Sequence, residues 1–248
     1  MQQNNKKFGL VGKDISYSFS KKYFTEKFSA DLFDDFTYEN FDIPTIEDFP
    51  IILKNNPDLK GLNVTIPYKE TIILFLNTLS EKAAKIGAVN VIRFTKKGNL
   101  KGYNSDWYGF KKSLQPLLKP HHKKALILGT GGAAKAVAFA LDELDIIYTF
   151  VSREATEKTI GYDRLNATTF DNFQIVINCT PLGTHPNVKE FPPIPYEFFT
   201  NKHIAFDLIY NPEVTQFLKK ASKKGALIKN GYEMLVLQAE KAWKIWNK

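Results

Sequence analysis

The chain has 248 residues, of which 44% are hydrophobic, enough for one large domain or two smaller ones with packed cores. Its single cysteine, Cys179, excludes an internal disulfide framework and lies in an apolar setting that indicates a buried small residue. No run approaches the roughly 20 apolar residues of a membrane span, and the first residues lack the apolar core of a signal peptide. We therefore expect a cytoplasmic protein.

The formal net charge of +8 does not by itself indicate a nucleic-acid-binding protein. Only Arg93, Arg153 and Arg164 are arginines, and the lysines are scattered along the chain as on a solvated surface. A positive balance also suits an anionic substrate and a phosphorylated cofactor. We expect a small-molecule substrate as partner, and neither nucleic acid nor membrane. The four histidines lack ligand-type neighbours at suitable spacing, so we expect no metal.

The first half alternates apolar strands with helical stretches, which predicts an α/β layer. In chain order we expect a strand at 8–11, a helix at 20–28, a strand at 36–41, a helix at 49–54, a strand at 62–65, helical segments over 69–86, and strands at 89–94 and 100–103. The turn-rich residues 97–99 predict a hairpin between the last two strands. A helix over 106–118 leads out of this region.

The next strand runs into a glycine turn and an alanine-rich helix, in the string LILGTGGAA at 126–134. Gly129 and Gly131 occupy the first two glycine positions of a dinucleotide-binding fingerprint, and Ala134 occupies the third, where the pattern allows Ala. Backbone N–H groups and the positive end of the helix would then face a pyrophosphate. A turn that joins a strand to a helix and binds nothing is the alternative.

The strand at 147–151 ends in Ser152 and Arg153, where an NAD site would place an acidic residue against the ribose. An arginine here favours the 2′-phosphate of NADP, and an ordinary surface arginine is the alternative. Strands at 175–178, 204–207 and 226–229 and a helix at 215–223 complete a small doubly wound sheet. The last helix, 234–246, carries an apolar set broad enough to be buried, namely Leu235, Leu237, Ala239, Ala242, Trp243 and Trp246.

Three polar clusters in the first half have residue types that core strands do not need. Ser18 and Ser20 point the same way if their segment is extended and would offer two hydroxyls to a carboxylate, with helix capping by one of them as the alternative. Pro67 stops a strand, so Lys69 emerges at the carboxyl end of that strand. Asp106 follows the last strand, where it could also cap the next helix.

Read together, these clusters resemble the shikimate dehydrogenase family, whose members reduce 3-dehydroshikimate to shikimate with NADPH. The resemblance extends over nearly the whole chain and rests on motifs that occur in the family's order. They lie at residues 12–20, 63–69 (NVTIPYK), 87–90 (GAVN), 102–106 (GYNSD), 129–134, 152–153, 178–183, 207–212 and 230–235, followed by Gln238.

The resemblance implies an α/β fold of two domains, with residues 1–106 plus 231–248 as the substrate-binding and catalytic domain and residues 107–230 as a Rossmann-like NADP-binding domain. The C-terminal helix would return to the N-terminal domain. The catalytic pair would be Lys69 and Asp106. The substrate would be bound by Ser18, Ser20, Thr65, Asn90, Tyr210 and Gln238. NADP(H) would be bound by Gly129, Thr130, Gly131, Gly132, Ala133, Ser152, Arg153, Thr180 and Gly231.

Two alternatives stay open. Glu154 stands where the family has Thr, and a carboxylate repels a nearby phosphate, so a quinate/shikimate dehydrogenase with relaxed cofactor and substrate choice is the first. The second is a non-catalytic ligand-binding module of the same fold, although both catalytic positions are filled. The sequence is compatible with a monomer or a homodimer.

Overall fold

The computed structural model describes residues 6–16, 18–33 and 35–248. These form two compact units, the first ending at Ser105 and completed by Ala239–Lys248, and the second spanning Asp106–Gln238. Helix α8 (Tyr232–Trp246) contributes its last residues to the first unit. The predicted return of the C-terminal helix to the N-terminal domain is therefore confirmed.

The first unit is built on a six-stranded sheet in the order β2-β1-β3-β5-β6-β4. Its strands are β1 (Lys6–Gly12), β2 (Phe36–Asp42), β3 (Leu59–Val64), β4 (Thr78–Leu79), β5 (Val91–Phe94) and β6 (Leu100–Tyr103). The first three strands are parallel, and β5 runs antiparallel to both β3 and β6. Val91, the first residue of β5, pairs with Asn63 near the end of β3. The segments after β1, β3 and β6 and before β5 therefore meet at one edge of the sheet.

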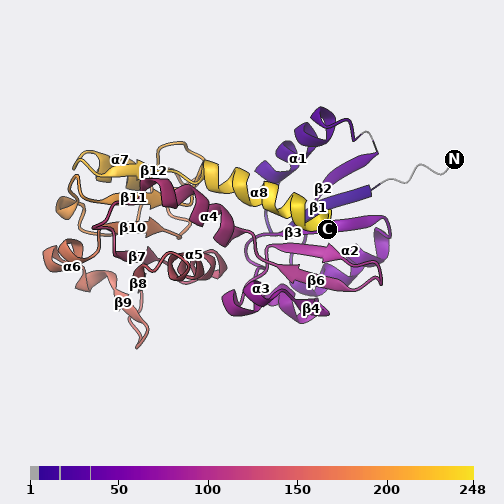
Figure 1. Cartoon of the computed structure of the whole chain (residues 1–248), viewed down its shortest axis with the longest axis horizontal. Helices are drawn as coiled ribbons and strands as arrows, with labels where there is room; N and C mark the ends of the chain where they lie inside the picture. Colours follow the sequence, from indigo (N-terminus) through magenta and orange to yellow (C-terminus); the bar gives the residue numbers. More distant parts are fainter. Residues whose placement is uncertain (1–5, 17, 34) are drawn as a thin grey trace. The chain divides into compact units, whose positions relative to one another are not determined.

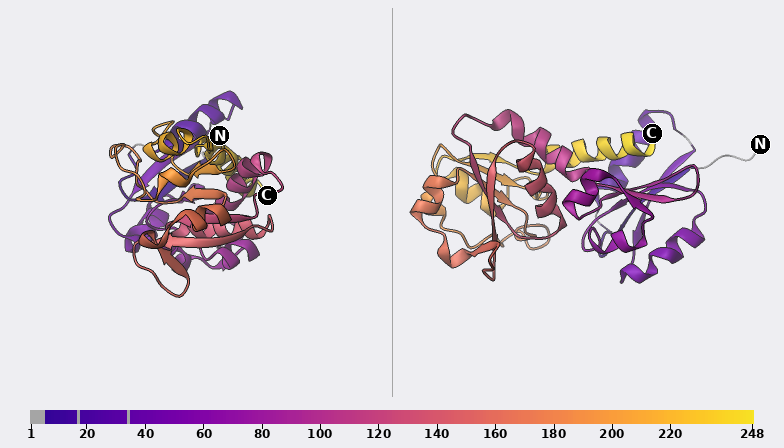
Figure 2. Two further views of the ribbon diagram at one scale, coloured as in Figure 1. Left: turned by 90° about the vertical axis from the view of Figure 1, so that its left-hand side faces the viewer. Right: turned by 60° about the horizontal axis from the view of Figure 1, so that its bottom comes forward.

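Helices cover both faces of this sheet. Helix α1 (Phe19–Ala30) and the end of α8 pack on one face, and α2 (Phe49–Asn55) and α3 (Glu81–Ile86) pack on the other. Figure 2 shows the last turns of α8 beside α1, where Lys27 and Glu240 form an ion pair at 3.0 Å. The Trp246 indole donates a hydrogen bond to the backbone oxygen of Ile92 at 3.1 Å, which fixes the helix end on the sheet.

The second unit is a parallel six-stranded sheet in the order β12-β11-β10-β7-β8-β9. Its strands are β7 (Lys124–Leu128), β8 (Ile147–Ser152), β9 (Thr159–Gly161), β10 (Ile175–Asn178), β11 (Ile204–Asp207) and β12 (Leu227–Lys229). The chain winds outward from β7 in one direction and from β10 in the other. In such sheets ligands bind at the carboxyl ends of the strands where the winding reverses, here between β7 and β10.

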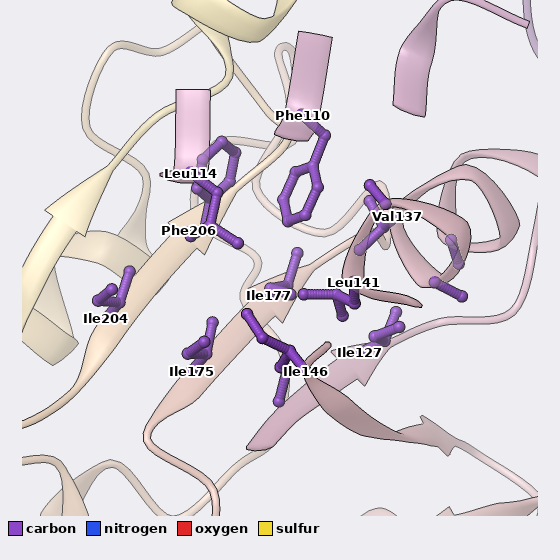
Figure 3. Packing of buried hydrophobic residues seen from close by; sticks show 14 of the residues in the cluster. Phe110, Leu114, Ile127, Val137, Leu141, Ile146, Ile175, Ile177, Ile204 and Phe206 are labelled. Carbon is purple, nitrogen blue, oxygen red and sulfur yellow. The ribbon is translucent and has the colours of Figure 1, made fainter. Parts of the chain in front are cut away.

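Helices α4 (Asp106–Leu114) and α5 (Gly132–Asp142) pack on one face of the second sheet, and α6 (Ala167–Asn172) and α7 (Gln216–Ser222) pack on the other (Figure 1). The core between the sheet and the first pair of helices is close-packed, with Phe110 from α4 edge-on to Phe206 from β11 at 4.9 Å between ring centroids (Figure 3). Cys179 packs against this core but is only half-buried, whereas its apolar setting predicted a buried residue.

The structure corrects several expectations about local elements. Residues 69–86 are not wholly helical, because a short 3-10 segment (Thr71–Phe75) is followed by β4 before α3 begins. The short elements β9 and α6 were not predicted. Of the six apolar residues singled out on the last helix, Ala239, Ala242 and Trp246 are buried and the others are half-buried. Among the described helices, none is long and apolar enough to cross a membrane.

Candidate functional site

Ser18 is the N-cap of α1 and Ser20 lies in its first turn, so the segment is not extended beyond Ser18. Tyr17, directly before Ser18, lies outside the described residues. The Ser18 hydroxyl caps the helix by accepting a hydrogen bond from the backbone N–H of Ser20 at 3.1 Å. Capping occupies an acceptor position of that hydroxyl and not its proton. The capping alternative is therefore correct for Ser18, and it is compatible with donation of the Ser18 proton to a carboxylate.

Thr65 and Lys69 follow β3 at the sheet edge where the first unit's loops meet. The backbone N–H of Thr65 donates to Val11 of β1 at 2.9 Å, which carries the pairing of these strands one residue further. The Lys69 side chain is half-buried, and its backbone oxygen accepts from the N–H of Val89 at 2.7 Å. Both predicted residues thus lie on segments tied to the same edge.

Asn90 is buried beside them, with 3% of its surface exposed. Its Oδ1 accepts from the backbone N–H of Ser105 at 2.6 Å, and its Nδ2 donates to the Ser105 hydroxyl at 3.0 Å. The next residue, Asp106, is 5% exposed and begins α4 in the second unit. Asn90 therefore fixes the backbone directly before the predicted catalytic carboxylate.

Polar residues that the sequence reading did not assign connect Asn90 with Ser20 inside the first unit. The Tyr38 hydroxyl donates to Asn63 Oδ1 at 2.8 Å, and Asn63 Nδ2 donates to the Asn90 backbone oxygen at 3.2 Å. Burial raises the pKa of Tyr38, and a hydrogen bond with the Ser20 side chain opposes that rise. Tyr38 lies in a predicted strand, but the sequence contains no signal for the hydrogen-bond partner of its hydroxyl.

The glycine turn in the second unit has the geometry of a phosphate-binding helix start. Gly129 has φ +100°, a left-handed conformation that disfavours residues with a side chain, and Gly131 is the N-cap of α5. No side chain caps α5, so its first N–H groups have no side-chain acceptor at the cap. Ala134 is 1% exposed and packs in the core, as expected for the third fingerprint position. Thr130, Gly132 and Ala133 complete the turn, and the residues present fit a dinucleotide pyrophosphate.

The segment after β8 forms a compact polar turn. The Ser152 hydroxyl contacts the Thr159 hydroxyl at 3.1 Å and the backbone oxygen of Glu154. Arg153 is exposed, with Glu154 exposed next to it. Burial raises the pKa of Tyr162, and the positive charge of Arg153 opposes that rise. Both predicted 2′-phosphate residues are thus at the carboxyl end of β8, accompanied by a carboxylate.

Thr180 is held by Asn178, the last residue of β10. Asn178 Oδ1 accepts from the Thr180 backbone N–H at 3.0 Å and from its hydroxyl at 2.6 Å. Asn178 Nδ2 in turn donates to Asp207 Oδ1 at 3.0 Å on the neighbouring strand. Asn178 and Asp207 belong to the motifs at 178–183 and 207–212, and the sequence assigns a role to neither of them.

The remaining predicted residues follow β11 and β12. Tyr210 is half-buried on the loop after β11, and Gln238 is 8% exposed on α8. Gly231 donates its backbone N–H to the Ile209 oxygen at 3.0 Å, and a Cβ added at Gly231 would lie 2.0 Å from the Leu208 oxygen. Gly231 is therefore required for the close approach of two backbones.

A parallel doubly wound sheet with this glycine turn at its switch point, joined to a second α/β unit with buried polar groups at one sheet edge, defines a two-domain dinucleotide-binding protein. Residues 10–92 match the family model described as the shikimate dehydrogenase substrate binding domain. The chain is 38% identical to a Clostridium botulinum protein named shikimate dehydrogenase (NADP(+)), over 96% of this chain and 95% of the relative.

Two solved structures extend the comparison. Shikimate 5-dehydrogenase from Thermus thermophilus, in complex with NADP(H) and shikimate, is 30% identical with a TM-score of 0.85, covering 97% of this chain and 93% of that one. The Listeria monocytogenes enzyme, in complex with shikimate and NAD, is 25% identical with a TM-score of 0.84, covering 98% and 92%. The chain belongs to the shikimate dehydrogenase family.

Proposed function

We propose that this protein is an NADP-dependent shikimate dehydrogenase that reversibly reduces 3-dehydroshikimate to shikimate, a step of aromatic amino acid biosynthesis. The observation that carries the proposal is the 38% identity over nearly full length to a relative of that name. The polar residues at the carboxyl edges of both sheets give it a chemical basis. We place the enzyme in the cytoplasm, as a monomer or a homodimer.

We assign the proton transfer to Lys69 and Asp106. NADPH, when bound, supplies the hydride to the ketone carbon. The Lys69 ammonium donates the proton to the ketone oxygen and stabilises the negative charge that develops there. Asp106 holds that ammonium in place by a charge-assisted hydrogen bond. In the reverse direction Lys69 accepts the hydroxyl proton of shikimate.

The substrate carboxylate is assigned to Ser18 and Ser20, and the ring hydroxyls to Thr65 and Asn90. Tyr210 and Gln238 complete the substrate contacts in this proposal. The Asn90–Ser105 hydrogen bonds support it, because they hold an amide group rigidly at the edge where Asp106 follows. Polar groups held in fixed positions select for a ligand whose hydroxyls match their geometry, since a ligand without those hydroxyls forgoes the hydrogen bonds.

The cofactor is assigned to the turn Gly129–Ala133, with Ser152 and Arg153 at the 2′-phosphate and Thr180 and Gly231 near the nicotinamide end. Glu154 beside Arg153 favours the second candidate, a quinate/shikimate dehydrogenase with relaxed cofactor choice, because its charge opposes a phosphate. The Listeria relative solved with NAD supports the same candidate.

The test is oxidation of shikimate by NADP⁺ with the purified chain, followed by NADPH absorbance, with Lys69→Ala as the matched negative control. NADPH formation that the variant lacks supports the proposal, and equal rates for the two proteins contradict it. Running shikimate and quinate, each with NADP⁺ and NAD⁺, separates the two candidates. Comparable efficiency with all four combinations would favour the relaxed enzyme.

A further inference from the structure

Asp207 is a buried carboxylate that the proposed chemistry does not use. It is the last residue of β11, has no exposed surface and lies in the second unit. A buried carboxylate is costly unless several donors satisfy it, so its partners indicate what it is retained for. Its partners are Asn178 at the end of β10, Ile209 on the loop after β11 and Thr215 at the start of α7, all at the carboxyl edge of the sheet.

One carboxylate oxygen connects two segments. Asp207 Oδ1 accepts from Asn178 Nδ2 at 3.0 Å and from the backbone N–H of Ile209 at 3.1 Å. Asn178 holds Thr180 through its own Oδ1, so this bond anchors the predicted cofactor loop after β10. Ile209 directly precedes Tyr210, so the second bond anchors the loop with the predicted substrate residue.

The other oxygen fixes the far end of the Tyr210 loop. Asp207 Oδ2 accepts from the Thr215 hydroxyl at 2.6 Å, and the same hydroxyl caps α7 by accepting from the N–H of Leu218 at 3.3 Å. The loop between Ile209 and Thr215 is thus tied to one carboxylate at both ends. Backbone bonds extend these ties, from His185 to Asn211 at 3.2 Å and from Gly231 to Ile209 at 3.0 Å.

We propose that Asp207 is a positioning residue that sets the cofactor loop carrying Thr180 and the substrate loop carrying Tyr210 in one fixed arrangement, so that cofactor and substrate affinity depend on the same buried carboxylate. This inference rests on the proposed function. Asp207 touches neither ligand in this proposal and acts through Asn178, Ile209 and Thr215. The three bonds are made by a side chain at one fixed strand end, so losing it releases both loops together.

The test is a set of steady-state measurements on the full chain. Asp207→Ala is expected to raise KM for both NADP⁺ and shikimate by about tenfold, as loss of about 1.4 kcal/mol of binding would. Asp207→Asn retains an oxygen for Asn178 and Ile209, and its amide can donate to the Thr215 hydroxyl, so both KM values are expected within about threefold of wild type. Rescue by Asn distinguishes positioning from a need for negative charge.

Two milder variants separate the effect on the Thr180 loop from the effect on the Tyr210 loop. They remain informative if Asp207→Ala does not fold. Asn178→Ala is expected to raise mainly KM for NADP⁺, because it frees the Thr180 loop. Thr215→Val is nearly isosteric and is expected to raise mainly KM for shikimate, because it frees one end of the Tyr210 loop. A merely structural role would lower thermal stability in all three variants and leave both KM values unchanged, which would overturn the proposal.

His203 supplies the matched control, because it lies directly before β11, at the opposite end from Asp207. It is buried, contacts the Phe170 backbone oxygen through Nε2 at 3.0 Å and accepts from the Thr200 N–H at 3.0 Å. His203→Ala is expected to lower thermal stability and leave both KM values within about twofold of wild type. If wild type does not oxidise shikimate, the proposed function fails; if it does and Asp207→Ala binds normally, only this inference fails.

Discussion

The burial of Asp207 also predicts how the free energy of unfolding depends on pH, and no ligand is needed to test this. Burial raises the pKa of its carboxyl from 3.8 to about 7, and hydrogen bonds from Thr215, Ile209 and Asn178 only partly oppose that rise. In the unfolded chain the same group ionises near pH 4. Between these two values the folded state binds more protons than the unfolded state, so stability falls as pH rises.

The magnitude follows from the difference between the two states. A rise in pKa from 3.8 to about 7 corresponds to about 4 kcal/mol. This stability is fully present below about pH 4 and is lost as pH rises through about 7. Asp207→Asn is neutral at every pH and keeps the oxygen that accepts from Asn178 and Ile209. The free energy of unfolding of wild type minus that of the variant should therefore fall by about 4 kcal/mol from about pH 4 to about pH 8.

The assay is urea unfolding at a series of pH values, analysed as a difference so that other titrating groups cancel. Glu197→Gln, which removes an exposed carboxylate in the same unit, is measured in parallel as the control for loss of a carboxylate at the surface. A wild-type-minus-variant difference for Asp207→Asn that stays flat or rises over this pH range would refute the reasoning. A rise would show that the three donors outweigh the desolvation.

Three further predictions concern the site itself. Lys69→Ala should lower turnover by roughly 10²- to 10⁴-fold with little change in KM for shikimate. The control Lys60→Ala, at an exposed lysine, should leave both turnover and KM unchanged. Ser18→Ala should lower stability by about 1 kcal/mol through the lost cap and raise KM for shikimate about tenfold. The control Ser80→Ala removes a comparable cap from α3 and should lower stability without changing KM. Equal KM values in the two variants would show that Ser18 only caps the helix. Gly231→Ala should destabilise the protein by about 1–3 kcal/mol, because its Cβ would meet the Leu208 oxygen. Gly131→Ala has no atom within 4 Å of its Cβ, so it should fold normally but raise KM for NADP⁺. Chemical denaturation and steady-state kinetics on both proteins test that last contrast, which normal NADP⁺ binding by Gly131→Ala would contradict.

The sequence predicted the elements that have a strong hydrophobic period or a distinct local signal. Strands such as β7 and β10 are continuous apolar runs, and the glycine turn identifies the start of α5. It missed β4 and β9, which have two and three residues, because such short segments contain no measurable period. It left an extended segment and a helix cap both open at Ser18–Ser20, because the two use the same residue types.

The hydrogen-bond partners inside the site could not be predicted, because strand register decides them. Asn178 meets Asp207 only since the two residues pair directly across β10 and β11, although 29 positions separate them in the chain. The Asn63 side chain reaches Asn90 because β5 runs antiparallel to β3 and brings its start to the end of that strand. Register depends on long-range packing, and a motif reports only its own residue types.

The need for hydrogen-bond acceptors at a sheet edge explains why Asn178 and Asp207 stand at strand ends. A loop that leaves a sheet edge has backbone N–H groups without ladder partners, and a buried one must find an acceptor. Asn178 and Asp207 supply that acceptor to Thr180 and Ile209. A polar residue at the last position of a buried strand is therefore expected to organise the loop, and the loop residue two or three positions later to face the ligand. On this argument we propose that Thr180 and Tyr210 face the ligands and that Asn178 and Asp207 position them.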